Sequence, residues 1–152
     1  AQIVLTGPID EYFGYQFGPL EYRSLSFDTR VIDKENYQGC AVINYTSSRQ
    51  PFTRVIEHKH FERSLAKKTV VTFEYPKPWR PGMDPFYPVN DNANNARYIK
   101  YKKLAEATNT LFGGRLGTYQ YLDMHQVVGS ALKMTRDLIK NPTNKGGVSA
   151  VL

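Results

Sequence analysis

Alternation of apolar and polar positions marks the first half of the chain. In residues 22–30, Leu25, Phe27 and Thr29 lie on one face of an extended segment and polar residues lie on the other, which predicts a half-buried strand. Further strands are predicted where β-branched and aromatic residues are concentrated, at residues 41–46, 53–57 and 69–75. The connections between these later strands are short and polar, so we expect antiparallel pairing.

A helical period of about 3.6 residues replaces this alternation in the second half. Residues 93–107 place Tyr98 and Tyr101 on one face, after an N-cap at Asp91 or Asn92. The last helix, residues 124–140, has an apolar stripe at Met124, Val127, Val128, Ala131, Leu132, Thr135, Leu138 and Ile139. With a short buried strand at residues 111–112, these elements predict an α+β fold. It would be a mainly antiparallel β-sheet with a few helices, ending in a strand–turn–helix.

The segment from Pro76 to Pro88 differs from its surroundings. It contains five of the nine prolines, together with Trp79 and Tyr87. Proline lacks the N–H that a central strand needs, so we expect an extended aromatic loop outside the sheet. Such a loop can contact a ligand, or it can cover the edge of the core as a lid.

Composition narrows the class of protein. The chain has 152 residues, of which 41% are hydrophobic, and this size suits one domain with its own core. The formal charge of +6 favours anionic partners, either a nucleic acid or a phosphorylated small molecule. No apolar run approaches the ~20 residues that span a bilayer, and we expect a cytoplasmic protein. The single cysteine, Cys40, fits a reducing compartment, and we expect a small buried side chain rather than a nucleophile.

The two ends of the chain indicate a piece of a longer protein. The first residue is not Met, and residues 3–6 resemble a strand that is already under way. We therefore expect a segment of a larger protein. The last residues, 141–152, begin with a turn-rich stretch, and we expect a flexible tail there.

Candidate chemistry centres on residues 111–126. Gly113 and Gly114 allow the backbone to approach a ligand closely, and Arg115 offers a planar guanidinium to phosphate. Asp123 begins the last helix with Gln126 in position for a capping box, and the free N–H groups of a helix start favour anions. A nucleotide or flavin site is one interpretation. A plain glycine turn with a solvated Arg115 is the other.

Other well-known site patterns are absent from the sequence. No Ser-His-Asp signature, P-loop or GxGxxG motif is present. His58 and His60 would share one face of a strand, but with no third ligand nearby we expect no metal site. Arginine with phenol hydroxyls suits a diphosphate and a sugar. These two residue types recur at Arg23, Arg54, Arg115, Tyr87, Tyr119 and Tyr121.

A series of short motifs connects the chain to a known family. In order they read TGPIDEYF, LEYRSL, QG, AVINYT, TRVIEHKHF, FYPVNDN, FGGRL and YLDMHQV, from Thr6 to Val127. This series closely resembles the C-terminal part of the bacterial UDP-galactopyranose mutase family, and the resemblance runs from about Ile3 to Ile139. A whole series in this order is far more specific than any one motif.

The resemblance implies a flavoenzyme that interconverts UDP-galactopyranose and UDP-galactofuranose in galactofuranose biosynthesis. Residues 1–110 would form an antiparallel sheet domain, and residues 111–140 the returning strand and helix of an FAD-binding domain. Reduced FAD would attack the anomeric carbon through N5 and displace UDP, giving a flavin–sugar adduct with no net redox change. The dinucleotide fingerprint of the family would lie outside this chain, so we expect the isolated chain to be inactive.

The resemblance also implies roles for individual residues. Arg115 would be the catalytic residue, because it would hold the substrate diphosphate close to the flavin. The substrate-binding residues would be Tyr87, Arg115, Tyr121, Arg54, Asn44 and Arg23. The cofactor-binding residues would be Gly114, Arg115, Asp123 and Met124. A homodimer is compatible with the resemblance, and neither nucleic acid nor a membrane is an expected partner.

Two other functions compete with the flavoenzyme. The first is a non-catalytic nucleotide-sugar binding module that reuses the sheet domain. The second is a basic nucleic-acid binder, which rests on the charge of +6 alone.

Overall fold

The computed structural model describes residues 3–140 and 147–148, and these divide into two compact units. The parallel-sheet unit contains the residues up to Arg23 and those from Trp79 onward, and the antiparallel-sheet unit contains Ser24–Pro78. These units divide the chain at other points than the expected boundary at residue 110. The reason is that the first strand pairs with a strand from the last third of the chain.

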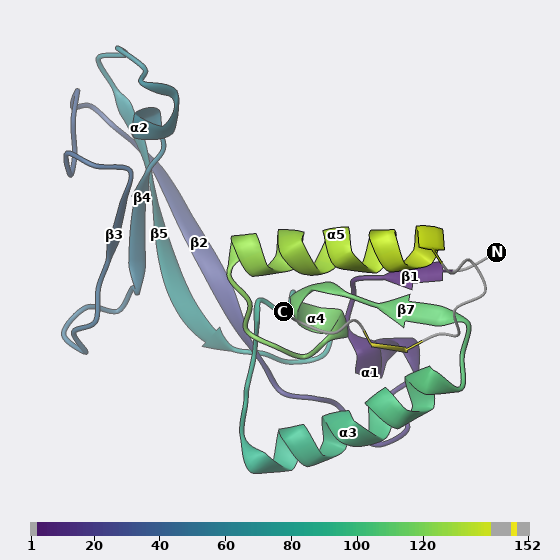
Figure 1. The fold of residues 1–152 in the computed structure, drawn as a ribbon. Helices are drawn as coiled ribbons and strands as arrows, with labels where there is room; N and C mark the ends of the chain where they lie inside the picture. Colours follow the sequence, from purple (N-terminus) through teal and green to yellow (C-terminus); the bar gives the residue numbers. More distant parts are fainter. Residues whose placement is uncertain (1–2, 141–146, 149–152) are drawn as a thin grey trace. The chain divides into compact units, whose positions relative to one another are not determined.

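Three short parallel strands form the sheet of the parallel-sheet unit, in the order β1 (Ile3–Leu5), β7 (Thr110–Phe112) and β8 (Gly147–Val148). The long helix α5 (Met124–Lys140) runs along one side of β1 and β7 in Figure 1. The short helix α1 (Ile9–Tyr12) and the helix α3 (Asn92–Glu106) lie on the other side. Buried side chains of this second side form the core, namely Ile9, Leu20, Tyr22, Tyr101, Ala105, Phe112 and Tyr119.

A buried carboxylate organises the first residues of this unit. Asp10 is fully buried, and it accepts hydrogen bonds from the backbone N–H of Leu20 at 2.8 Å and from the hydroxyl of Tyr22 at 2.9 Å. Burial and the neighbouring Asp10 raise the pKa of Tyr22, so this phenol stays a donor. The loop between α1 and β2 (Tyr22–Ile32) is therefore tied to both elements.

Four antiparallel strands form the sheet of the antiparallel-sheet unit, in the order β3 (Val42–Asn44), β4 (Arg54–Glu57), β5 (Thr69–Pro78) and β2. A short helix, α2 (Lys59–Glu62), follows β4 directly. Val55, Val71 and Phe73 are the buried centre of this unit. The first two residues of β2 belong to the other unit, where they pair with β6 (Tyr87–Pro88).

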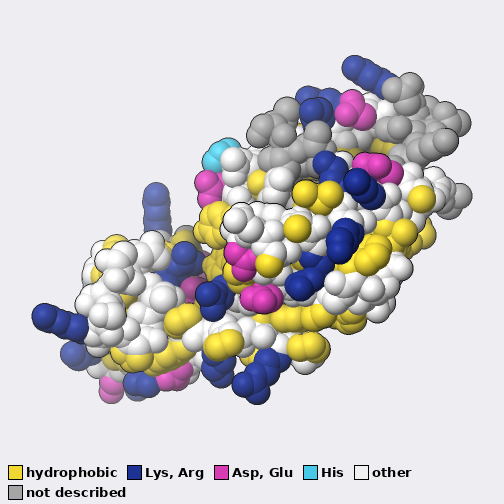
Figure 2. Space-filling view, turned by 90° about the horizontal axis from the view of Figure 1, so that it is seen from below, with side chains coloured by type: hydrophobic (Ala, Val, Ile, Leu, Met, Phe, Trp, Pro, Cys, Tyr) yellow, Lys and Arg dark blue, Asp and Glu magenta, His cyan; other side chains and the backbone are white. Residues whose placement is uncertain are grey.

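The structure confirms the α+β class and both long helices. The cap of α3 is Asp91, whose carboxylate accepts from the N–H of Asn94 at 2.7 Å. Tyr101 is buried on its inner face, whereas Lys100, Lys102 and Lys103 are exposed. On the side of the parallel-sheet unit that carries α3, Figure 2 shows Lys and Arg side chains interspersed with acidic and apolar ones, as in a solvated helix face.

Two strand expectations were wrong. In β2 the buried residues are Tyr22 and Ser24, while Phe27 is 50% exposed, so the predicted apolar face is not the buried one. The proline-rich segment is not a loop throughout, because β5 continues to Pro78 and β6 begins at Tyr87. The prolines of β5 lie beyond Glu74, the last β5 residue that is paired with β4, so their missing N–H groups leave no gap in that ladder.

Three smaller expectations also need correction. Cys40 is exposed rather than buried. His58 and His60 follow β4 instead of lying in it. Within the expected tail, Gly147–Val148 form β8, which pairs in parallel with Leu111 and Phe112, and the rest of that tail lies outside the described residues.

Much of the apolar stripe of α5 faces outward. Among its exposed members are Met124, Val128, Leu132 and Ile139, and only Ser130 of this helix is fully buried. The described part of the chain contains no helix with the length and apolar character needed to cross a bilayer.

Candidate functional site

A tight turn after β7 presents the principal candidate residue, Arg115. Gly114 adopts a left-handed backbone with φ of +71°, which glycine reaches without strain, and it begins the short helix α4 (Gly114–Gly117). A side chain at Gly117 would place its Cβ 3.2 Å from the carbonyl oxygen of Leu5, so the turn also packs closely on β1. The hydroxyl of Thr118 closes the turn by donating to the carbonyl oxygen of Gly114 at 2.6 Å.

The Arg115 guanidinium is held by one hydrogen bond and two aromatic rings. Its Nε–H donates to the carbonyl oxygen of Leu122 at 2.5 Å. Its Cζ lies 5.1 Å from the ring centroid of Tyr121 and 5.8 Å from that of Tyr87. The two rings are 5.5 Å apart with an angle of 31° between their planes. The structure thus brings together Tyr87, Arg115 and Tyr121, three of the residues that the family resemblance assigns to substrate binding, and their roles stay predictions.

The charge of Arg115 is not neutralised within the described residues. None of their carboxylates lies within ion-pair distance of its guanidinium. Because Nε is occupied by Leu122, the terminal nitrogens are the donors that remain for a ligand. A half-buried cation with donors to spare is suited to an anion with paired oxygens, such as a phosphate or a diphosphate.

Arg23 lies next to this group through strand pairing. It is directly opposite Tyr87 in the antiparallel pair of β2 with β6, and the N–H of Phe86 donates to its carbonyl oxygen at 2.9 Å. Directly opposite residues of such a pair project to the same face of the sheet. Arg23 is exposed, so a second cation is available beside Tyr87.

The start of α5 lies immediately after Leu122. The backbone N–H of Asp123 donates to the side-chain oxygen of Gln126 at 2.8 Å, which is one half of the predicted capping box. Asp123 and Met124 are exposed, and Met124 keeps 83% of its surface. Beneath the helix, a small cavity of about 160 Å³ is lined by residues that include Gly113, Gly114 and Met134.

Arg54 and Asn44 form a separate group in the antiparallel-sheet unit. They are directly opposite each other on β3 and β4, and the Nε–H of Arg54 donates to the side-chain oxygen of Asn44 at 2.8 Å. Arg54 also lies 3.6 Å from the carboxylate of Glu74 on β5. This arginine is therefore fixed in its orientation by both neighbouring strands.

A buried acid in the same unit shows how the loop after β2 is fixed. Glu57 is fully buried, which by itself would raise its pKa, but the backbone N–H groups of Gln38 and Tyr37 outweigh burial and lower the pKa to about 2. Those two hydrogen bonds measure 2.9 Å and 3.0 Å. Nε2 of His60 lies 3.1 Å from the same carboxylate, whereas Nε2 of His58 lies 2.7 Å from the hydroxyl of Thr72. The two histidines thus have different partners.

Tyr119 has a different position from the one that its residue type suggested. Its phenol was expected among groups that suit a diphosphate, but the side chain is 1% exposed and its hydroxyl contacts two backbone carbonyl oxygens. Sequence reasoning also missed the carbonyl of Leu122. Every residue has a backbone carbonyl, so the sequence does not indicate which one accepts a hydrogen bond from Arg115.

Known proteins are similar to this chain over most of its length. The family model described as UDP-galactopyranose mutase matches residues 1–121. Over 147 residues the chain is 38% identical to a probable UDP-galactopyranose mutase of Klebsiella pneumoniae, covering 95% of this chain and 38% of that protein. It is 38% identical over 141 residues to a dTDP-fucopyranose mutase of Escherichia coli (91% and 37%), and 37% identical over 145 residues to a UDP-galactopyranose mutase of Mycoplasma pneumoniae (91% and 36%). The chain spans less than two fifths of the length of these curated relatives.

Proposed function

The chain belongs to the UDP-galactopyranose mutase family, and on this premise we propose that it is the C-terminal part of a flavin-dependent isomerase. The reaction would interconvert UDP-galactopyranose and UDP-galactofuranose, and this part would supply the wall that holds the diphosphate. The observation that carries the proposal is the Arg115 guanidinium, which is oriented by Leu122, flanked by Tyr87 and Tyr121, and unpaired with any carboxylate of the described residues.

Arg115 would act on the bond between the sugar and UDP. As that bond breaks, negative charge grows on the diphosphate, and a cation already in position stabilises it without further reorganisation. The two rings cover part of the guanidinium, so the diphosphate would approach the terminal nitrogens. Arg23 would add a second positive charge, and Tyr87 and Tyr121 would place their hydroxyls near the sugar phosphate.

Arg54 and Asn44 would contribute from the antiparallel-sheet unit. In this proposal Asn44 orients Arg54, and both residues bind the substrate. The nearby Glu74 offsets part of its charge, so we assign Arg54 a smaller electrostatic share than Arg115.

The start of α5 fits a flavin. Helix N–H groups that lack intrahelical partners favour electron-rich acceptors such as the ring carbonyls. Met124 adds an exposed apolar side chain beside them. We therefore propose that Gly114, Arg115, Asp123 and Met124 contact FAD. When bound and reduced, FAD supplies the nucleophile for the anomeric carbon, and the reaction has no net redox change.

The test compares binding and turnover in one series. Calorimetric titration of the chain with UDP is carried out for the wild type and for Arg115→Ala, and conversion of UDP-galactopyranose is followed by chromatography with reduced FAD in the longer protein. Binding that depends on Arg115, together with conversion only in the longer protein, supports the proposal. Wild-type turnover in the Arg115→Ala protein would remove its central assignment.

A non-catalytic nucleotide-sugar binding module is the second candidate. It is favoured by the Arg115 guanidinium beside Tyr87 and Tyr121, which would hold a diphosphate whether or not a flavin is bound. The same series separates the two functions, because a module would bind UDP through Arg115 but give no conversion in the longer protein. A homodimer in the cytoplasm is part of our proposal for either function, and neither nucleic acid nor a membrane is a partner in it.

A further inference from the structure

We propose that Tyr119 is a positioning residue that fixes the two tyrosines around Arg115 relative to each other. It would not contact the substrate. This inference rests on the proposed function of Arg115, but its geometry can be tested without that function. The buried phenol connects the strand that carries Tyr87 to the turn that carries Tyr121, and this connection sets the space in which the guanidinium is held.

The first connection is made by the Tyr119 hydroxyl. Its oxygen lies 2.7 Å from the carbonyl oxygen of Glu21 and 2.9 Å from that of Val89. Glu21 directly precedes β2 and Val89 directly follows β6. The two residues are hydrogen-bonded to each other, because the N–H of Val89 donates to the carbonyl oxygen of Glu21 at 3.0 Å. Burial raises the pKa of Tyr119 to about 12, so the hydroxyl stays protonated and remains a donor. Val89 follows Tyr87 by two residues, so this contact holds the end of β6.

The second connection is made by the Tyr119 backbone. Its φ of +48° is left-handed, which is uncommon for a residue with a side chain, and it reverses the chain after α4. The N–H of Gln120 then donates to the carbonyl oxygen of Arg115 at 3.0 Å. This reversal sends Tyr121 and Leu122 back toward Arg115. Tyr119 thus fixes the end of β6 through its hydroxyl and the direction of the chain toward Tyr121 through its backbone.

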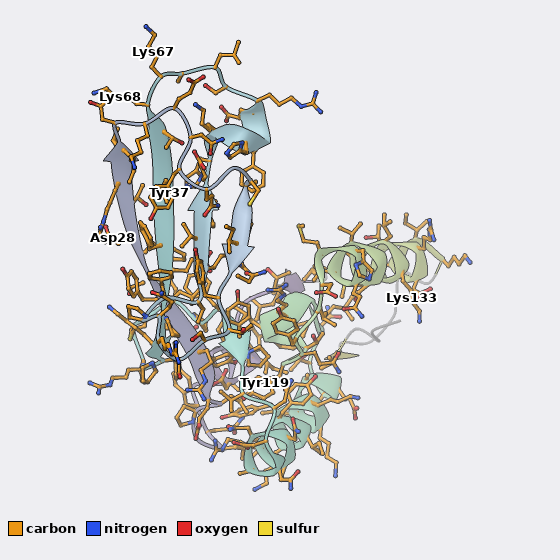
Figure 3. All side chains as sticks on the ribbon, turned by 90° about the vertical axis from the view of Figure 1, so that its left-hand side faces the viewer. Asp28, Tyr37, Lys67, Lys68, Tyr119 and Lys133 are labelled. Carbon is orange, nitrogen blue, oxygen red and sulfur yellow. The ribbon has the colours of Figure 1, made fainter. Side chains whose placement is uncertain are left out.

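The ring of Tyr119 is fixed by its neighbours. It meets Tyr22 edge-on, with centroids 5.5 Å apart, and it lies 5.7 Å from the ring of Tyr98 at an angle of 31°. Figure 3 shows Tyr119 among the packed side chains of the parallel-sheet unit. Removing only the hydroxyl would leave these ring contacts in place. Tyr119→Phe therefore separates the link to β6 from the packing of the ring.

Tyr98→Phe provides a matched control. Tyr98 is a half-buried phenol on the adjacent helix face, it touches the same ring, and burial raises its pKa to about 12 as well. Among the hydrogen bonds of the described residues, none involves its hydroxyl. A general effect of removing a phenol oxygen from this core would appear in both variants. An effect through Glu21 and Val89 would appear in Tyr119→Phe alone.

The experiment has two readouts on the whole chain. The first is hydrogen exchange of the Arg115 Nε–H by NMR, with the signal assigned by its loss in Arg115→Ala. We expect exchange at least tenfold faster in Tyr119→Phe and unchanged in Tyr98→Phe, because a loosened turn exposes the bond to Leu122. The second is the dissociation constant for UDP, which we expect to rise about tenfold in Tyr119→Phe and less than twofold in Tyr98→Phe.

The outcomes are distinguishable from failure of the proposed function. Unchanged exchange in Tyr119→Phe overturns the positioning role, whatever happens to UDP binding. If exchange is faster in Tyr119→Phe but the wild-type chain does not bind UDP, the result supports the positioning role and counts against the diphosphate site. An equal loss of UDP affinity in Tyr119→Phe and Tyr98→Phe would also overturn the inference, because the general removal of a phenol oxygen, and not the link to Glu21 and Val89, would then be the cause.

Discussion

The Nε–H of Arg115 donates to the carbonyl oxygen of Leu122 at 2.5 Å, so the turn between them brings Leu122 back to Arg115. This contact fixes the plane of the guanidinium before a ligand arrives. The terminal nitrogens are then the donors left for recognition. A lysine has no equivalent group, because its ammonium cannot hold the carbonyl and present a second planar pair of donors.

Replacing Arg115 tests orientation separately from charge. In the longer protein we expect Arg115→Ala to lose ~3–4 kcal/mol of transition-state stabilisation, since removing a preorganised charge-stabilising donor has effects of that size. Arg115→Lys keeps the charge but loses the orientation, so its turnover should lie between that of the wild type and that of Arg115→Ala. Steady-state kinetics with UDP-galactopyranose measures the three turnover rates. Equal turnover in the lysine variant and the wild type would show that orientation has no role.

The glycine turn offers a prediction about stability. Gly114→Ala should lower the free energy of unfolding by ~1–2 kcal/mol, because φ of +71° is strained for a residue with a Cβ. Gly7→Ala is the control, since a Cβ there would meet nothing within 4 Å and φ is not in the left-handed region. Urea unfolding of both variants measures the difference. Similar midpoints for the two variants would contradict the strain argument.

Glu57 should make stability depend on pH in the acid range. Its folded pKa of about 2 lies below its ordinary value of 4.5, so the folded state binds the proton less readily than the unfolded state. The stabilisation is therefore complete above about pH 4.5 and is lost as the pH falls toward 2. Thermal unfolding between pH 2 and pH 7 should show this loss for the wild type. Glu57→Gln, which has no carboxylate to titrate, should show a flatter profile that starts from a lower stability.

The outward apolar side of α5 predicts self-association. Val128 and Leu132 are 57% and 52% exposed, and an exposed apolar surface of this kind favours contact with another surface. The double substitution Val128→Lys and Leu132→Lys should shift the chain toward the monomer in sedimentation velocity without lowering its unfolding temperature. A chain that is already monomeric at high micromolar concentration would contradict this expectation.

Local signals explain why α3 and α5 could be predicted from the sequence. Asp91 caps α3 through the N–H of Asn94, three residues on, and α5 covers the predicted residues 124–140. A cap and a helical period act within a few residues, so they are readable in the sequence. The grouping of Tyr87, Arg115 and Tyr121 came from family resemblance, because Tyr87 is distant in sequence from the other two.

The missed features depend on partners elsewhere in the chain. Ser24 is buried and Phe27 exposed according to which segments pack on β2, and alternation alone cannot show which face is covered. Gly147–Val148 form a strand only because β7 offers them an edge. Tyr119 has the residue type of a ligand contact, but its surroundings give it two backbone acceptors. In each case, residues distant in sequence but close in space determine the burial, the strand pairing or the hydrogen bonds.

The pairing of Ile3 with Thr110 has a consequence for biosynthesis. The parallel-sheet unit is built from two separate stretches, and the antiparallel-sheet unit is one uninterrupted stretch between them. During translation the uninterrupted stretch can complete its strand pairs as soon as it leaves the ribosome. The first strand must wait until residue 112 has emerged before it can pair with β7. Closing such a long loop is slow, so we expect β1 and β7 to pair later than the strands of the sheet between them.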